Sequence, residues 1–269
     1  VYFTGGTLQS ITGATSFDYL PVNNNNSVIL NNNVLVNQTL ALTSGKINVG
    51  VNTLTIGAGG DITGYSSANF IVTNSTGVLQ RNAVGATVKW FPVGYGNPAT
   101  NYTPLTIVNN GTARDLSVRS TSPPQNPVTD NTRIVNVQWD VTSSGSGAIV
   151  DASFNWNSAN QAVSYNVSGN GELGNYTTGP NYAITNIGTM GGQSKSVSGI
   201  ALSSGSNKLV LGNTNAVYVA PPANDLCANA STLVPNAAAV QGTTVAATAS
   251  SPFPSDIDVW YKFTAPCTA

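Results

Sequence analysis

The chain has 269 residues, enough for two or three domains, and 41% of them are hydrophobic, so a core can form. Only 7% are charged, and this neutral polar composition is typical of extracellular β-proteins. A net charge of −1 with nine Lys and Arg gives no basic face for nucleic acid. No apolar run reaches about 18 residues, so we expect no membrane insertion.

The first segment, residues 1–87, has the repeat pattern of a short parallel β-solenoid. Apolar pairs spaced by one residue indicate short strands, and three successive pairs span about 20 residues, one coil of a three-sided solenoid. An antiparallel sandwich is the alternative, but its strands are usually longer than three residues. The predicted interior of residues 20–62 comprises Leu20, Val22, Val34, Val36, Leu40, Leu42, Ile47, Val49, Leu54 and Ile56.

Asparagines mark the predicted corners of this solenoid. Asn32 lies 20 residues before Asn52, so the two are expected at equivalent corners of neighbouring coils. Asn tolerates left-handed backbone, and its side-chain amide can hydrogen-bond from one coil to the next.

Residues 88–219 are predicted to form an Ig-like β-sandwich. Their strands are longer, lie between Gly, Pro and Asn turns, and alternate with a period of two. Trp139 and Trp156 are expected to anchor the core, with sugar stacking as the less favoured role. The two expected inner faces are formed by Val135, Val137, Trp139 and Val141, and by Val150, Ala152, Phe154 and Trp156.

Residues 220–269 are expected to hold a proline-containing linker and the start of a jelly-roll-like β-module. Cys227 and Cys267 are a candidate disulfide, since an extracellular setting favours a bridge; two unpaired thiols are the alternative. Asp256 and Asp258 are weak candidates for Ca²⁺ ligands, and two solvated surface carboxylates are the favoured interpretation. No other cofactor is expected.

The sequence argues against an enzyme. It contains no His, which excludes Ser-His-Asp and Cys-His catalysis and His-ligated metals. Its one Glu, Glu172, lies in the turn-like run GNGELGN and is expected to be solvated, while a glycosidase needs two facing carboxylates. The glycine-rich runs GAGG and TMGGQ lack the lysine of a phosphate-binding loop and are expected to be turns.

Several segments together carry a family resemblance. The order FTGGTLQSITG, VLVNQTLALTSGKINVGVNTLTIG, FPVG, VQWDV and ASFNW resembles large secreted surface proteins of the Bacteroidota, many of which use the type IX secretion system. The later run PPANDLCANASTL with SDIDVWYKFTAP is similar to a β-jelly-roll module of the same proteins. The resemblance covers most of the chain, and it implies adhesive or gliding-associated roles, or non-catalytic parts of secreted hydrolases.

The favoured function is a non-enzymatic, extracellular or cell-surface structural and adhesive protein, a stalk or filament subunit. Its expected partners are copies of itself, other surface proteins or glycans. Both ends of the chain suggest a piece of a longer protein; were it a whole subunit, its open ends would favour head-to-tail filaments. The alternative is a carbohydrate-binding accessory region of a hydrolase, with candidate aromatics Tyr65, Tyr95, Tyr102, Tyr176 and Tyr182.

Overall fold

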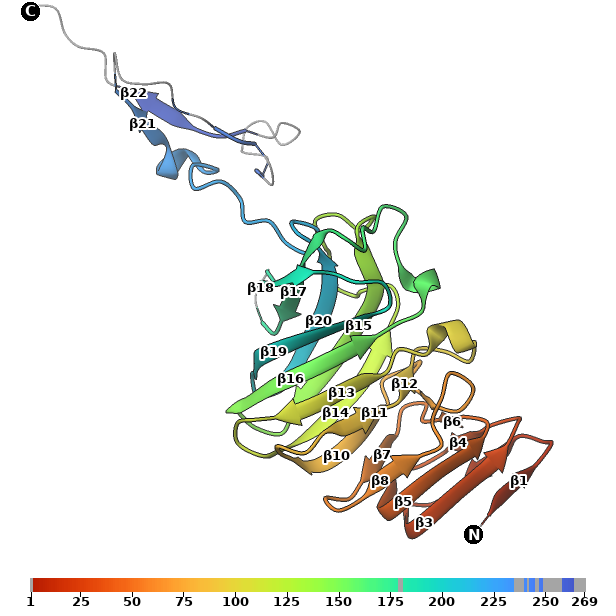
Figure 1. Ribbon diagram of the computed structural model, residues 1–269. Coiled ribbons are helices and arrows are strands. Elements are labelled where there is room, and N and C mark those ends of the chain that lie inside the picture. Colours follow the sequence, from red (N-terminus) through yellow and green to blue (C-terminus); the bar gives the residue numbers. More distant parts are fainter. Residues whose placement is uncertain are drawn as a thin grey trace, which may run out of the picture. The chain divides into compact units, whose positions relative to one another are not determined.

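The computed structural model describes residues 2–178, 181–234, 240, 242–244, 247–248 and 258–263. The described chain is all-β, with a parallel β-solenoid followed by a β-sandwich (Figure 1). Its contacts divide it into two compact units, Val1–Val217 and Tyr218–Ala269. The solenoid and the sandwich both lie in the first unit.

Most strands of the solenoid are short and two are long, and the solenoid partners of each strand lie one coil away in the sequence. Its strands are β1 (Phe3–Gly5), β2 (Gln9–Ile11), β3 (Thr15–Asn24), β4 (Val28–Leu30), β5 (Val34–Ser44), β6 (Ile47–Asn48), β7 (Thr53–Ile56), β8 (Asp61–Thr63), β9 (Ile71–Val72), β10 (Val78–Val84) and β12 (Val93–Gly94).

Three parallel ladders give the coils three sides. One ladder runs β2-β4-β6-β9-β12. The other two share the long strands β3 and β5, whose pairing is interrupted by a register shift between Phe17 and Tyr19. The first half of β5 pairs with β7 and its second half with β8. The antiparallel alternative is therefore wrong, and the three-sided solenoid is confirmed.

The predicted 20-residue register is also confirmed. Leu20 pairs with Leu40, and Val34 pairs with Leu54. All ten predicted interior residues are buried, none with more than 2% of its surface exposed. The alternation of the sequence is therefore enough to place the interior of these coils.

The corner asparagines link successive coils, as expected. The Asn32 side-chain oxygen accepts a hydrogen bond from the Gly13 amide at 2.7 Å. The Asn52 side-chain nitrogen donates to the Leu30 carbonyl at 2.7 Å. These bonds satisfy a backbone amide in the bend after β2 and a backbone carbonyl at the end of β4.

The sandwich consists of longer, antiparallel strands in two layers (Figure 1). One layer is the four-stranded sheet β11-β13-β16-β19, and the other is the run β10-β14-β15-β20-β17-β18. The elements are β11 (Lys89–Phe91), η1 (Ala99–Asn101), β13 (Leu105–Asn109), β14 (Arg114–Thr121), β15 (Ile134–Ser143), β16 (Ala148–Asn155), η2 (Ser158–Asn160), β17 (Asn170–Tyr176), β18 (Ala183–Thr189), β19 (Ser194–Leu202) and β20 (Gly205–Asn213).

Both predicted inner faces of the sandwich are buried. Trp139 has no exposed surface and packs edge-on against Phe154, with ring centroids 5.1 Å apart. Its indole N–H donates to the Thr103 carbonyl at 2.9 Å, so the polar atom of this core anchor is satisfied. Trp156 is also buried, with 3% of its surface exposed.

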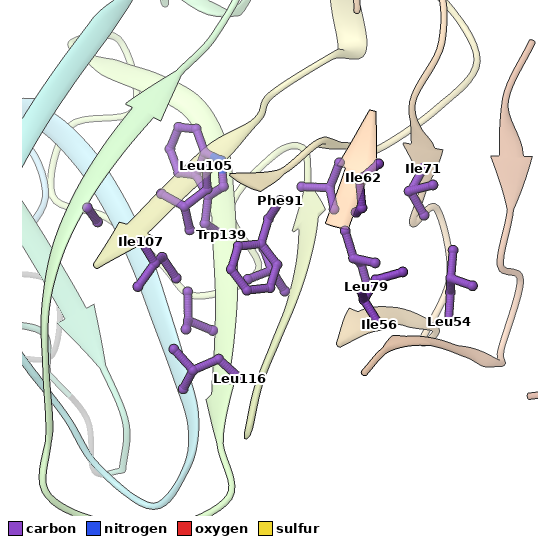
Figure 2. Close-up of a cluster of buried hydrophobic side chains, with 14 of the residues drawn as sticks. Leu54, Ile56, Ile62, Ile71, Leu79, Phe91, Leu105, Ile107, Leu116 and Trp139 are labelled. Atoms are coloured by element: carbon purple, nitrogen blue, oxygen red, sulfur yellow. The ribbon is translucent and has the colours of Figure 1, made fainter. Parts of the chain in front are cut away.

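Strand β10 joins the solenoid to the sandwich. It pairs in parallel with β7 of the solenoid and antiparallel with β14 of the sandwich. The two parts therefore share one sheet, and one cluster of buried side chains runs through both. Figure 2 shows this continuity, from Leu54 and Ile56 past Leu79 to Phe91 and Trp139.

The expectation that Glu172 is a solvated turn residue is wrong. Glu172 lies within β17 and exposes 2% of its surface. Its carboxylate accepts backbone hydrogen bonds from Asn215 at 3.0 Å and Val217 at 2.7 Å. The neighbouring glycines make room for packing instead of a turn, since a Cβ at Gly174 would overlap the Val217 side chain.

The second unit contains η3 (Cys227–Asn229), β21 (Ser231–Leu233) and β22 (Tyr261–Phe263). β21 and β22 pair in parallel, with Ser231 opposite Tyr261. Cys227 is exposed, and Cys267 lies outside the described residues, as does Asp256. The disulfide and the Ca²⁺ site therefore stay predictions. None of the described helices is long and apolar enough to span a membrane.

Candidate functional site: an aromatic cleft at one end of the sandwich

A cleft of about 510 Å³ lies where the four-stranded sheet meets the loop that follows β8. β11 and β16 end here, and β13 and β19 begin here, so with the loop after β8 side chains from five segments converge. The residues that line it are the aromatics Tyr65, Trp90, Tyr102 and Trp156, the polar residues Ser66, Ser67, Asn155, Asn157 and Gln193, and Ala99 and Pro104.

Tyr65 and Trp90 form a pair on one wall of the cleft. Their ring centroids are 5.2 Å apart and their planes are inclined by 33°. Trp90 exposes 38% of its surface, while its neighbour Phe91 is fully buried, as strand alternation requires. A large aromatic face is therefore held at the surface by a strand whose next residue is anchored in the core.

A buried arginine fixes the backbone beneath this pair. The Arg81 side chain donates through Nε to the Trp90 carbonyl at 2.8 Å and through one terminal nitrogen to the Gly60 carbonyl at 3.2 Å. Its other terminal nitrogen lies 3.4 Å from a carboxylate oxygen of Asp61. The guanidinium thus ties β11 to the loop that precedes β8, and so positions Trp90 relative to Tyr65.

Tyr102 is half-buried and packs against Phe70, with ring centroids 5.1 Å apart. Burial, followed by repulsion from Tyr65, raises the pKa of the Tyr102 hydroxyl above its usual value. Burial is also the largest cause that raises the pKa of Tyr65. Both hydroxyls therefore stay protonated and able to donate hydrogen bonds near neutral pH.

Trp156 carries an unsatisfied polar group. Its indole N–H is buried, and no described residue accepts a hydrogen bond from it. The indole packs edge-on against Tyr165, with centroids 6.4 Å apart. A buried donor without an acceptor costs about 1–3 kcal/mol, so a partner from outside the chain would relieve this cost.

The cleft brings together only some of the predicted aromatics. Tyr65 and Tyr102 line it. The Tyr95 hydroxyl instead donates to the side chain of Asn160, outside the cleft. Tyr176 and Tyr182 pair with each other in the sandwich, at a centroid distance of 5.6 Å.

Trp90 is not among the candidates that the sequence suggests, and Trp156 is expected as a core anchor, with sugar stacking as its less favoured role. A local pattern in the sequence points to Trp90. In the run KWF, Phe91 faces the core, so strand alternation places Trp90 at the surface. Burial of Trp156 is confirmed, yet the same residue lines the cleft. That second role depends on the fold and has no local signal.

The described residues contain no group of three or more His, Cys, Asp or Glu side chains arranged to hold a metal ion. Comparison with known proteins gave no matching family model, no matching curated protein and no matching solved structure. The chemistry of the cleft itself is therefore the basis for a functional argument.

Proposed function

We propose that this chain is a non-enzymatic structural and adhesive protein of the extracellular surface, a stalk segment or filament subunit. The observation that carries the proposal is the shared strand β10. It belongs to the ladders of both the solenoid and the sandwich, and the hydrophobic core is continuous across it. A chain joined in this way has no hinge at β10. Such rigidity suits a stalk segment or filament subunit that must resist a pulling force.

Composition supports the same role. The chain has no His and a single Glu, and that Glu is occupied in holding backbone amides. Neutral polar residues replace charges over most of the surface, which suits an extracellular β-protein. The resemblance to secreted surface proteins of the Bacteroidota fits this proposal, and export through a type IX system is part of it.

Mechanical unfolding of the full chain tests the load-bearing part of the proposal. When the chain is pulled by its ends, the first unit should open in a single event that releases roughly 700 Å of extended chain. Release in small steps of about 20 residues would mean that the coils peel off one at a time. That result would contradict a rigid stalk.

The surface and adhesive parts are tested on cells that produce the protein. Antibodies should label intact cells, and deletion of the gene should reduce attachment to solid surfaces. Complementation with the wild-type chain should restore attachment, whereas a Leu42→Asp chain, with a disrupted solenoid, should not. Labelling only after cell lysis, or unchanged attachment after deletion, would contradict the proposal.

A further inference from the structure

The aromatic cleft presents flat apolar faces beside uncharged hydrogen-bonding groups. Trp90 and Tyr65 supply a partly exposed pair of rings on one wall. Side-chain amides of Asn155, Asn157 and Gln193 lie around it. Its volume of about 510 Å³ falls within the range of about 300–1,000 Å³ that is usual for small-molecule sites.

The charge of the cleft limits what it can bind. None of the described residues that line it is charged. Arg81, which holds the Trp90 backbone, is buried and donates to Trp90, Gly60 and Asp61, so it offers nothing to an anion. An anionic ligand would lose its hydration here and gain no counter-charge, so an uncharged ligand is favoured.

We propose that this cleft binds an uncharged sugar of a polysaccharide, with one ring stacked on Trp90 and Tyr65. A pyranose ring has an apolar face of C–H groups that fits an aromatic face, and a rim of hydroxyls that both donate and accept hydrogen bonds. Side-chain amides match such a rim, because each amide also both donates and accepts. The proposal goes beyond the scaffold role and does not depend on it.

The indole N–H of Trp156 takes a defined part in this site. It is buried, it belongs to a residue that lines the cleft, and no described residue accepts from it. A sugar hydroxyl is the acceptor that we assign to it; because the N–H is buried in the unbound chain, the hydroxyl reaches it only when side chains that line the cleft shift on binding. Binding would then satisfy a donor that the unbound chain leaves without a partner.

Affinity electrophoresis of the full chain tests the proposal. The gels contain hydroxyethyl cellulose, xyloglucan, galactomannan or soluble starch as neutral polymers, and alginate or polygalacturonate as anionic polymers. We expect retardation by at least one neutral polymer and by neither anionic polymer. Trp90→Ala should weaken the binding by about tenfold or more, the change that corresponds to the loss of one stacking face.

Two variants and a matched control keep the test independent of folding. Tyr65→Ala removes the other ring of the pair and should also weaken binding, should Trp90→Ala prove unstable. Tyr19→Ala removes an aromatic ring that is 52% exposed on the solenoid, outside the cleft, and should bind as the wild type does. Trp156→Phe keeps a ring but removes the N–H, and should weaken binding in protein that circular dichroism shows to be folded.

Several outcomes would overturn the proposal. These are an absence of retardation by every neutral polymer, retardation by the anionic polymers alone, or retardation that Trp90→Ala and Tyr65→Ala leave unchanged in folded protein. Self-association that Trp90→Ala abolishes, without any retardation, would assign the cleft to a protein partner instead. Unchanged binding by folded Trp156→Phe would contradict the role of its N–H.

Discussion

At the scale of single residues, the solenoid interior depends on aliphatic side chains that exclude water. Leu20, Leu40 and Leu42 have no exposed surface, and they stack in register between β3 and β5. A charge introduced among them would have neither water nor a counter-ion to stabilise it. The interior should therefore tolerate apolar substitutions far better than charged ones.

We expect Leu42→Asp to unfold the solenoid. Burying an unpaired carboxylate and losing the leucine contacts should cost more than about 4 kcal/mol. Circular dichroism and resistance to proteases would both report the loss. The control is Thr43→Asp, whose side chain is exposed at the next position and should leave both measurements unchanged. Native spectra and protease resistance for Leu42→Asp would show that the register is wrong.

A buried tyrosine, Tyr182, and a half-buried one, Tyr165, should make the first unit sensitive to alkaline pH. Burial raises the pKa of Tyr165 to about 12, and burial followed by Tyr176 and Asp140 raises that of Tyr182 to about 12. The unfolded chain loses these protons near pH 10. Stability should thus be fully present below about pH 10 and fall as the pH rises toward 12, because the unfolded state ionises first.

Urea unfolding at a series of pH values measures this dependence. The midpoint should be constant from about pH 8 to 9.5 and then decrease. Tyr165→Phe should make the decrease shallower, since one titrating group is removed. A midpoint that rises with pH in this range, or an unchanged slope for folded Tyr165→Phe, would contradict the assignment of the shift to burial.

At the scale of elements, glycines allow neighbouring coils to approach closely. Gly45 has a positive φ of 81°, and a Cβ at this position would overlap the Asn24 carbonyl of the preceding coil. Gly50 also has a positive φ, 58°, but a Cβ there would meet no atom within 4 Å. Alanine at Gly50 therefore introduces backbone strain alone, whereas alanine at Gly45 introduces backbone strain together with a clash between coils.

Alanine at these two glycines should have unequal effects. Gly50→Ala should cost about 1–2 kcal/mol, the usual penalty for left-handed backbone in other residues. Gly45→Ala should cost clearly more, because the coils must also move apart. Urea unfolding of the two variants provides the comparison. Equal losses would mean that the corner at Gly45 relaxes without displacing the neighbouring coil.

The sequence predicts those elements whose pattern is local. The 20-residue recurrence of apolar pairs identifies the coils, and the alternation around Trp139 identifies an inner face of the sandwich. The cleft could not be predicted, because Trp90, Tyr102 and Trp156 come together only when β11, β13 and β16 pair as neighbours in the four-stranded sheet. The prediction that Glu172 lies in a solvated turn is wrong because, in the sequence alone, glycines that make space for packing resemble those of a turn.

At the scale of the whole molecule, β10 joins the two parts of the first unit, because it pairs with strands of both. Leu79 lies in β10, is fully buried, and pairs with Leu54 of the solenoid and Val118 of the sandwich. Figure 2 shows Leu79 within the cluster that extends toward Phe91. A loss of packing at Leu79 should therefore destabilise the strands of the solenoid and those of the sandwich alike.

We therefore expect the solenoid and the sandwich to unfold together. Hydrogen exchange in increasing urea, followed separately at the amides of β5 and β16, should give coincident transitions. Leu79→Ala should lower the stability of both strands by about 2–5 kcal/mol, because it leaves a cavity at the junction. Val51→Ala, at a side chain that is 71% exposed, should lower neither. Separate transitions, or a Leu79→Ala effect confined to one strand, would mean that the shared sheet does not couple the two parts, and a stalk would then flex at β10.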